Sequence, residues 1–451
     1  MSSAPTLPRP ARRVSPGAGL ALTALTALLV FGTWAWVAHA RWSMPARGLG
    51  DHAPETLAGP PAAQPMQQPE PPATLAPARL AMPWVARGYA DIAPSLKHPA
   101  TAIEVAQGFA YIGSGTVLQV VDVRDPGAPR LLGRSTAADR PGAVFYAQDI
   151  VVSGSTAYML SLGADAQANR VADNSVLLVF DVADPAAPRL VQDMGLREIA
   201  YTLFMQDGWL YVGGLRAESS GPAIAGLLAI QAQQSPLQRG HFMDTDLLPT
   251  DTARLDSQHM VLAGQVRTSS DRYRASLEEW RFDQPGRPEK LRSWVGPESR
   301  NSELWLTSVA ILRGRAYAGG GHYINVFDVS HGNAVDLVVE LQIAETEAAC
   351  IPSFLAATGT VGVALGDCHP SDGSHIFTYS PLDGSVPGGH LTAPPLGSIE
   401  FRTGHMKRFL KPIAVENDIL FILGGEDREI DTLRIVDVSA PDAPVVVGRW
   451  R

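Results

Sequence analysis

One segment recurs along this chain, and its recurrence limits the fold more than any other feature. The clear copies are VLQVVDVRDPGAP at residues 117–129, VLLVFDVADPAAP at 176–188 and LRIVDVSAPDAP at 433–444, with a shorter copy, INVFDVS, at 324–330. Repetition of one segment at long intervals indicates an array of similar structural units, each of which buries its apolar surface against its neighbours.

Each copy predicts two β-strands joined by a sharp turn. The first half is apolar on both faces, as in a strand buried between two sheets. Asp-Pro then ends the strand, because proline fixes φ and aspartate bonds its own backbone. Upstream of the clear copies, at residues 102–113, 149–160 and 412–424, two apolar runs joined by a tight turn predict a hairpin. The unit therefore has four antiparallel strands, which we name A to D in chain order.

Weaker copies fill the intervals between the clear ones. They lie at residues 208–232, 259–288, 315–330 and 360–381, and bring the number of units to seven. Four-stranded units at a spacing of roughly 50 residues are typical of a β-propeller. We predict an all-β fold, a seven-bladed β-propeller of four-stranded antiparallel blades at residues 82–451, preceded by an N-terminal transmembrane helix and a disordered linker.

The repeated residues resemble those of a known family. Gly-x-x-Ala-Tyr followed by Leu-x-Val-x-Asp-Val-x-x-Pro-x-x-Pro is similar to the repeat of the LVIVD-repeat β-propeller family of bacterial and archaeal surface or periplasmic proteins. The match is sharp in three or four of the seven units, whereas units three, four and six lack the terminal Asp-Val. The resemblance implies a propeller fold and a location outside the cytoplasm, and it implies no reaction.

The N-terminal region predicts an exported protein. Residues 1–16 contain three arginines, and residues 17–38 contain no charge. About 20 apolar residues span a bilayer, and arginines before the span predict a cytoplasmic N-terminus. We therefore predict a cytoplasmic tail, a transmembrane helix or signal sequence at 17–38, and a Pro- and Ala-rich disordered linker at 41–81, which has too few large apolar residues to fold.

Two locations follow from this region. The favoured one is a single-pass protein of the inner (cytoplasmic) membrane, with its N-terminus inside and its propeller in the periplasm or outside. The alternative is secretion after signal cleavage near Ala40, since Ala38-His39-Ala40 fits a small-x-small cleavage site. The uncharged run is longer than the apolar region of a usual signal peptide, which favours the retained anchor.

Two segments compete for the outer strand of the last blade. Residues 83–89, PWVARGY, and the C-terminal residues 444–450, PVVVGRW, both resemble a strand D. The first would close the ring with an N-terminal strand, and the second would close it with a C-terminal one. The pattern does not choose between them.

Cys350 and Cys368 flank the A–B hairpin of the sixth unit. A three-residue turn at 358–360 would place them opposite each other, and a two-residue turn would place Cys350 opposite Asp367. In both cases the β-carbons come within bridging range, and an exported protein meets an oxidising compartment. We expect a disulfide, with two free buried thiols as the alternative.

Loop lengths indicate which face of the ring binds. The A–B and C–D turns of a blade lie on one face, and the B–C and D–A connections lie on the other, which we name the long-loop face. The A–B turns and most C–D turns are short. The long insertions are residues 135–144, 164–175, 216–225, 241–253, 267–275 and 392–405, all on the long-loop face. Loops on a rigid scaffold commonly bind partners, so we predict binding there.

Charged and aromatic residues of these connections are the candidate binding residues, because such residues are enriched at interaction hot spots. They are Arg140, Tyr146, Arg272, Tyr273, Trp294, Arg402, His405, Lys407 and Arg408. The predicted function is binding or scaffolding of an envelope protein, peptide or glycan. The alternative is an enzyme of hydrolase, lyase or dehydrogenase type at the mouth of the central channel, since propellers host such activities. A net charge of −9 without basic runs argues against nucleic acid.

Metal-binding candidates are weak, and we expect no cofactor. His369, His375, His390 and His405 fall close together in the sequence, but no spacing matches a known zinc motif. Asp244, Asp246 and Asp251 offer oxygen ligands of the kind calcium prefers, without the glycine and closing glutamate of a calcium loop.

Four aspartates recur at one position of the repeat and have a structural interpretation. They are Asp122, Asp181, Asp328 and Asp437. A residue that recurs with the unit is expected to maintain the unit. We predict that each accepts hydrogen bonds from its own C–D turn.

Overall fold

The inner and outer strands of the repeat form seven separate sheets. The computed structural model describes residues 100–450, which belong to the unit Leu80–Arg451. Short segments are excluded: 138–142, 166–169, 217–222, 233–235, 270–271, 300–305, 321–322, 331–333, 344–349, 359–360, 369–373, 383–389, 394, 402–412 and 424–432. The all-β, seven-bladed propeller predicted from the repeat is confirmed.

The first four blades follow one another along the chain. Blade one contains β1 (Ala100–Ala106), β2 (Phe109–Ser114), β3 (Val117–Asp122) and β4 (Arg130–Thr136). Blade two contains β5 (Ala143–Ser153), β6 (Thr156–Asp165), β7 (Arg170–Asp181) and β8 (Arg189–Leu196). Blade three contains β9 (Glu198–Gln206), β10 (Trp209–Arg216), β11 (Ile224–Gln231) and β12 (Arg239–Asp244). Blade four contains β13 (Leu247–Arg254), β14 (His259–Ser269), β15 (Arg272–Arg281) and β16 (Glu289–Ser299).

In the last three blades, one additional strand from the chain between the C and D strands of blade six joins blade five. Blade five contains β17 (Ser308–Leu312), β18 (Arg315–Gly320), β19 (Tyr323–Asp328), β20 (Asp336–Ile343) and β24 (His390–Ala393). Blade six contains β21 (Cys350–Ala357), β22 (Gly362–Cys368), β23 (Ser374–Tyr379) and β25 (Gly397–Phe401). Blade seven contains β26 (Ile413–Glu416), β27 (Ile419–Leu423), β28 (Leu433–Asp437) and β29 (Val445–Trp450).

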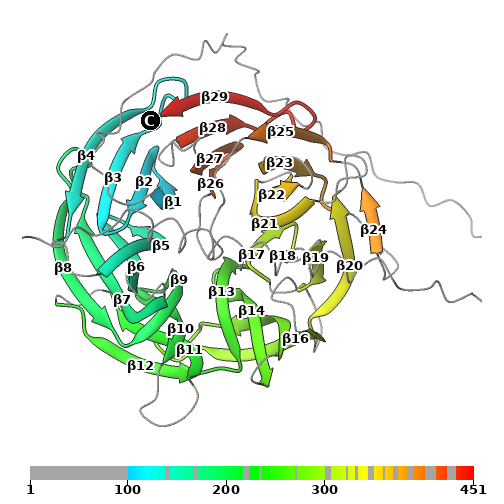
Figure 1. Ribbon diagram of the computed structural model, residues 1–451, viewed down its shortest axis with the longest axis horizontal. Helices are drawn as coiled ribbons and strands as arrows, with labels where there is room; N and C mark the ends of the chain where they lie inside the picture. Colours follow the sequence, from blue (N-terminus) through cyan, green and yellow to red (C-terminus); the bar gives the residue numbers. More distant parts are fainter. Residues whose placement is uncertain are drawn as a thin grey trace, which may run out of the picture. The chain divides into compact units, whose positions relative to one another are not determined.

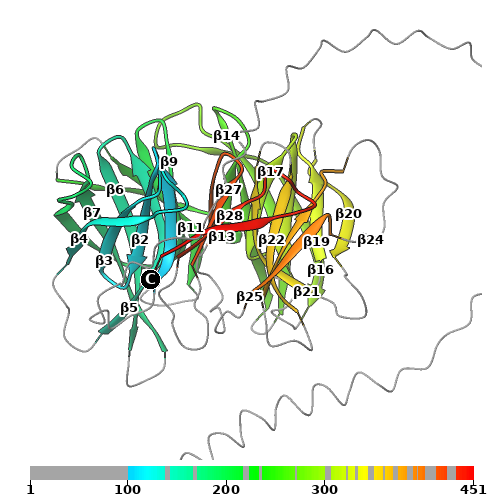
Figure 2. The same ribbon diagram turned by 90° about the horizontal axis from the view of Figure 1, so that it is seen from above.

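Figure 1 shows the sheets arranged around a centre, with the A strands β1, β5, β9, β13, β17, β21 and β26 innermost. Figure 2 shows the ring edge on, with blade two at one side and blade five at the other. A separate cluster of buried apolar side chains lies at each junction between neighbouring blades, including the junction of blades seven and one. The hydrophobic core is therefore distributed among the junctions between the blades.

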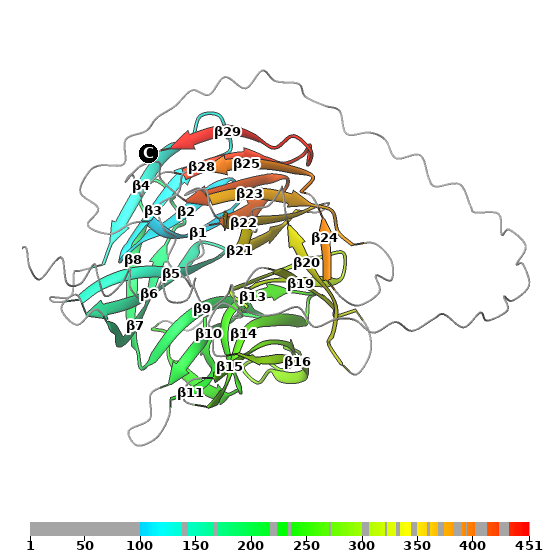
Figure 3. The ribbon, with the colours of Figure 1, turned by 45° about the vertical axis from the view of Figure 1, so that its right-hand side comes forward.

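Two predicted loops are largely strands. In segment 241–253, β12 and β13 are separated by residues 245–246, and in segment 392–405, β25 supplies the D strand of blade six. The sequence pattern concealed both strands, because β25 is a short outer strand and β13 carries Thr and Asp toward the centre of the ring. β24 pairs in parallel with β20 and lies outside it, as Figures 1 and 3 show.

The A–B turns are tight, as predicted. In blades one, three and five the first turn residue is Gln107, Asp207 or Arg313, followed by glycine, and both residues have positive φ. Turns with positive φ at both central residues match the twist of a hairpin, and glycine adopts that conformation without a steric penalty.

The recurring aspartates hold the C–D turns, which confirms that prediction. The Oδ1 of each accepts a hydrogen bond from the backbone N–H two residues later: Arg124 (3.1 Å), Ala183 (3.0 Å), Ser330 (2.9 Å) and Ser439 (2.8 Å). In blade one, the guanidinium of Arg124 also donates to Asp122, at 2.6 Å, and holds the pKa of that carboxyl below its usual value.

Each C–D turn packs against the preceding blade, often beneath the tyrosine of the Gly-x-x-Ala-Tyr motif. Tyr211 of blade three accepts a hydrogen bond from Gly286 of blade four at 3.1 Å, and Tyr317 of blade five accepts one from Leu382 of blade six at 2.9 Å. Tyr158 of blade two donates to the Ala232 carbonyl of blade three at 3.3 Å. Burial raises the pKa of Tyr211 to about 12, so its hydroxyl stays protonated at neutral pH.

The C-terminal strand completes the last blade. β29 pairs with β28, and Trp450 is fully buried with Phe421 and Ile103 in the cluster between blades seven and one. A Cβ at Gly448 of β29 would overlap the carbonyl oxygen of Pro126, in the C–D turn of blade one. The ring thus closes through the same contact that joins other blades, and the competing residues 83–89 lie outside the described residues.

No helix among the described residues is long and apolar enough to cross a membrane. The predicted transmembrane segment at 17–38 and the linker at 41–81 lie outside the part of the chain that the structure describes.

Replacing Gly448 by alanine is expected to destabilise the protein by about 2 kcal/mol, because the turn of blade one must move away to admit the methyl group. Gly195→Ala is the matched control, since a Cβ at Gly195, also on a D strand, meets no atom within 4 Å. Chemical denaturation of both variants measures the difference. Equal stabilities would show that this contact does not close the ring.

The cysteines lie opposite each other in the antiparallel register of β21 and β22, with Cys350 paired to Cys368. A bulge between Pro352 and Phe354 contributes to this register. We propose that they form a disulfide. A thiol reagent is expected to label neither cysteine in the unfolded, unreduced protein and both cysteines after reduction. Equal labelling under the two conditions would show that the disulfide does not form.

Candidate functional site in the central channel and on the long-loop face

The A strands around the channel are bulged, and the bulged residues join neighbouring blades. Register shifts lie at Thr101 in β1 and at Thr250 in β13. The Thr101 hydroxyl donates to the Ala147 carbonyl of blade two at 2.6 Å, and the Thr250 hydroxyl donates to the Leu306 carbonyl of blade five at 2.6 Å. A bulge turns an extra side chain out of the ladder, and here that side chain reaches the next blade.

Two buried carboxylates follow the bulges of blades two and four. Asp149 accepts the Leu203 N–H of blade three at 2.7 Å, and Asp251 accepts the Val309 N–H of blade five at 2.8 Å. Each also accepts the N–H of its own following residue, at 2.9 and 2.8 Å. Charge-assisted hydrogen bonds of this kind are strong in a buried setting. These aspartates therefore fix the angle between adjacent blades.

The A strands enclose a cavity of about 490 Å³ at the centre of the ring. Its described lining includes Glu104, Asp149, Asp251, Arg254, Thr252 and Met205. Arg254 also donates to the Met205 carbonyl at 3.1 Å. The walls of the cavity are polar, but backbone N–H groups already bond both aspartates, and the described lining contains no histidine or cysteine.

Most candidate binding residues lie where their contacts are not described. Arg140, Arg402, His405, Lys407 and Arg408 fall outside the described residues. Arg272 and Tyr273 begin β15, and Tyr146 is half-buried in β5. Trp294 was wrongly expected in a loop. It belongs to the D strand β16 and packs edge-on against Phe327 of blade five, with ring centroids 4.9 Å apart, so it is a partly buried residue packed against the core of that junction.

The acidic run proposed for calcium does not come together. Asp244 pairs with Arg216 at 3.3 Å, Asp246 lies 3.8 Å from the Lys290 ammonium, and Asp251 is buried beside the channel. No group of three metal-binding side chains occurs within the described residues. His375 and His390 lie on the separate strands β23 and β24, and His369 is not described.

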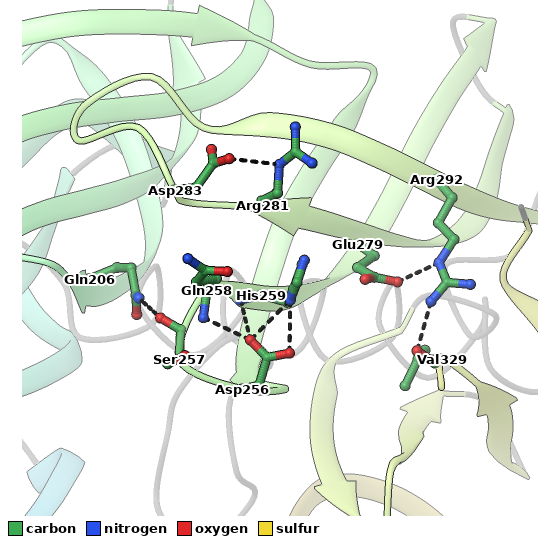
Figure 4. Close-up of polar contacts among 10 residues, drawn as sticks. All are labelled: Gln206, Asp256, Ser257, Gln258, His259, Glu279, Arg281, Asp283, Arg292 and Val329. Atoms are coloured by element: carbon green, nitrogen blue, oxygen red, sulfur yellow. Dashed lines mark hydrogen bonds and ion pairs between the residues drawn. The ribbon is translucent and has the colours of Figure 1, made fainter. Parts of the chain in front are cut away.

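Blade four carries a charge arrangement that pattern reading missed. Arg281 occupies the register position of Asp122, since it pairs with Glu289 as Asp122 pairs with Arg130. Its guanidinium contacts Asp283 at 3.2 Å, as Figure 4 shows, and it also contacts Glu289 at 2.5 Å. The signs of the ion pair of blade one are therefore reversed. The signal was present in the sequence as RFDQPGRPE aligned with DVRDPGAPR.

A second ion pair of blade four is buried and reaches blade five. Arg292 donates to Glu279 at 2.5 Å and to the Val329 carbonyl at 2.7 Å, as Figure 4 shows. It also donates to the Ala334 carbonyl at 3.1 Å. Arg292 stands at the position of Gly133 in blade one. A long side chain thus replaces the close backbone contact that glycine permits at other junctions.

The Asp256–His259 pair in Figure 4 also has a structural role. Asp256 accepts the backbone N–H of Gln258 at 2.7 Å and of His259 at 2.9 Å, and His259 Nδ1 lies 2.8 Å from its carboxylate. Burial raises the pKa of Asp256, but these hydrogen bonds outweigh burial and leave the pKa below its usual value. The pair holds the A–B turn of blade four.

Asp149→Ala is expected to destabilise the protein by about 2 kcal/mol, because the Leu203 N–H is left buried without its acceptor. Ser153→Ala, at an exposed residue of the same cavity wall, is the control and should change stability little. Thermal and chemical unfolding measure both variants. Unchanged stability of Asp149→Ala would show that this carboxylate does not hold the two blades together.

Comparison with solved structures returns proteins of low sequence identity. One is a hypothetical selenium-binding protein from Sulfolobus tokodaii, with 10% identity and a TM-score of 0.47, covering 67% of this chain and 81% of that chain. Another is from an S. cerevisiae complex of dbp5 with nup159 and gle1, with 11% identity, a TM-score of 0.40, and coverage of 72% and 86%. No curated protein matches the sequence.

The family model of the LVIVD repeat matches residues 99–136 and 430–451, which are blade one and the end of blade seven. These segments contain two Asp-held C–D turns, one held by Asp122 and one by Asp437, and the turn of Asp122 closes the ring against Gly448. With this repeat at both ends of seven blades, the chain is an LVIVD-repeat β-propeller protein.

Proposed function

We propose that this protein is a membrane-tethered, extracytoplasmic binding or scaffold module that holds an envelope protein, peptide or glycan on its long-loop face. The observation that carries the proposal is the unequal length of the blades. β6 and β7 of blade two have 10 and 12 residues, whereas β2 and β3 of blade one have 6 each. Four additional residues lengthen a strand by roughly 13 Å.

The additional length is on the long-loop face. At the A–B end, Ala157 and Ala110 occupy corresponding register positions, so β6 continues past the level at which β2 ends. Blade four behaves in the same way, because β14 and β15 extend to Ser269 and Arg272. Two B–C hairpins therefore project from one face of the ring, whereas the opposite face has short A–B turns and, except in blade six, short C–D turns.

The ring supports binding because its blades are fixed to each other. Buried clusters, tyrosine contacts and the Asp149 and Asp251 bonds hold neighbouring blades at set angles. Projecting hairpins on such a scaffold lose little conformational entropy when they bind, which favours affinity.

The tether and the location rest on the first 40 residues. The uncharged run at 17–38 behind three arginines supports a retained anchor, and cleavage near Ala40 would release the same propeller outside the cytoplasm. The alternative of an enzyme would need groups free to react in the channel, and the two buried aspartates there are already engaged.

The experiment compares the full-length chain with variants whose hairpins are shortened. An Asn-Gly turn would replace residues 163–174 between the register partners Leu162 and Ser175, and another would replace 266–274 between Gln265 and Ala275. A photo-crosslinking residue at position 168 of the intact chain is expected to capture a partner from envelope membranes. In a pull-down with this partner, the shortened chain should lose most of the binding while its melting temperature is kept.

The control carries the crosslinker at position 186, in the short C–D turn of blade two on the opposite face, and should capture little. A second control replaces residues 166–169 by Gly and Ser at equal length, which changes the sequence of the loop but keeps the length of the hairpin. Equal binding by the intact and shortened chains would contradict the assignment of the long-loop face.

A further inference from the structure

One segment of the chain has the pattern of a D strand but no place among the seven described blades. Residues 83–89, Pro-Trp-Val-Ala-Arg-Gly-Tyr, resemble residues 444–450, Pro-Val-Val-Val-Gly-Arg-Trp, which include β29. In both, three apolar residues follow the proline, and an aromatic residue stands six positions after it. The segment belongs to the unit Leu80–Arg451 that contains the propeller. Because every described blade already has a D strand, residues 83–89 are a surplus one.

The contact at Gly448 excludes this segment from the place of β29. With the prolines aligned, Arg87 corresponds to Gly448, and a Cβ at Gly448 would overlap the Pro126 carbonyl oxygen of blade one. Blade four does accommodate an arginine at the same position, because Arg292 extends to the Val329 carbonyl of blade five at 2.7 Å. In blade seven the C–D turn of blade one lies directly on the glycine, so an arginine there would displace the turn that closes the ring.

Blade five shows where a surplus strand can go. β24 pairs in parallel with residues 340–343 of the D strand β20, on its outer edge, as Figures 1 and 3 show. β20 and β29 have their bulges at the same position of the ladder, at Val338 and Val447, so a bulge in a D strand does not prevent a fifth strand. β24 comes from the chain of the following blade, and residues 83–89 precede blade one, which follows blade seven in the ring.

We propose that residues 83–89 form a fifth strand of blade seven, parallel to β29 on its outer edge. Among the described residues β29 is the outermost strand of its sheet, and Val445 at its start is 53% exposed. An open sheet edge leaves backbone N–H and C=O groups unpaired and invites pairing with another chain. The added strand would pair these groups and cover part of Val445.

The connection to β1 sets the direction of the added strand. D strands end on the long-loop face, where β1 begins, so a strand that leads into β1 by the shortest path runs parallel to β29. Five strands at a spacing of about 4.8 Å make a blade about 19 Å across. Residues 90–99 separate the segment from Ala100 of β1, and when extended they reach up to about 33 Å, which spans that width.

The chain that leads from the N-terminus would then join the ring at the rim of blade seven. This placement does not depend on the proposed membrane anchor, because cleavage near Ala40 leaves residues 83–89 in the chain. It gives blade seven the same number of strands as blade five. β29 would lie between two strands, and the outer edge of the blade that closes the ring would be covered.

The test measures hydrogen exchange of the full-length chain by mass spectrometry, read at a peptide that covers β29. The variant Val85→Pro/Ala86→Pro removes two successive backbone N–H groups, so whichever of them faces β29 can no longer donate. About half of the β29 amides, those that do not bond β28, are expected to exchange at least about fivefold faster in this variant than in the wild type. Ala62→Pro/Ala63→Pro, which adds two prolines outside the segment, is the matched control and should exchange as the wild type does.

Equal exchange of the β29 amides in the wild type and in both variants would overturn the proposal. Faster exchange at β4 in place of β29 would put the segment on blade one and would also overturn it. Faster exchange across all seven blades would do the same, because the loss of one edge strand should be confined to its own sheet. Failure of an envelope partner to bind the long-loop face would contradict only the proposed function.

Discussion

A closed ring of sheets depends on excluding water at every junction, because one open junction would expose apolar side chains of two blades. In this chain the C–D turn does much of that work. It is held internally by an aspartate such as Asp122 and packs on the preceding blade beneath a tyrosine or against a glycine. The turn therefore serves two blades at once, which explains why its residues recur when strand residues vary.

In the channel, too, single residues serve two neighbouring blades. Asp149 and Asp251 line a central cavity, where carboxylates commonly suggest catalysis, yet both accept backbone N–H groups of the next blade. Buried amides of a bulged strand need acceptors, and an aspartate beside the bulge supplies one. The polar character of the channel is in large part a result of how its A strands are joined.

Repetition made the architecture predictable from the sequence, and departures from repetition limited the prediction. The seven blades, the tight A–B turns and the turn-holding aspartates followed from residues that recur. The outer strand β25, the bulged β13 and the junction residue Trp294 were missed, because local patterns do not show which polar strand faces a channel or which tryptophan packs on another blade. The reversed charges of Arg281 and Asp283 required alignment of blades. For the candidate site, sequence could indicate the face with long connections, but it could not show that Asp149 and Asp251 accept backbone N–H groups of the next blade.

β24 has a consequence for how the molecule opens. The chain leaves blade six after β23, adds a parallel strand to the outer edge of β20, and returns as β25. The segment between β23 and β25 therefore links the two sheets, because its strand β24 is the outer strand of blade five. If one of the two sheets loses its outer strand, the outer strand of the other is released as well. Local unfolding there would involve both sheets as one cooperative unit, and amide hydrogens of β20 and β25 would exchange with solvent at linked rates.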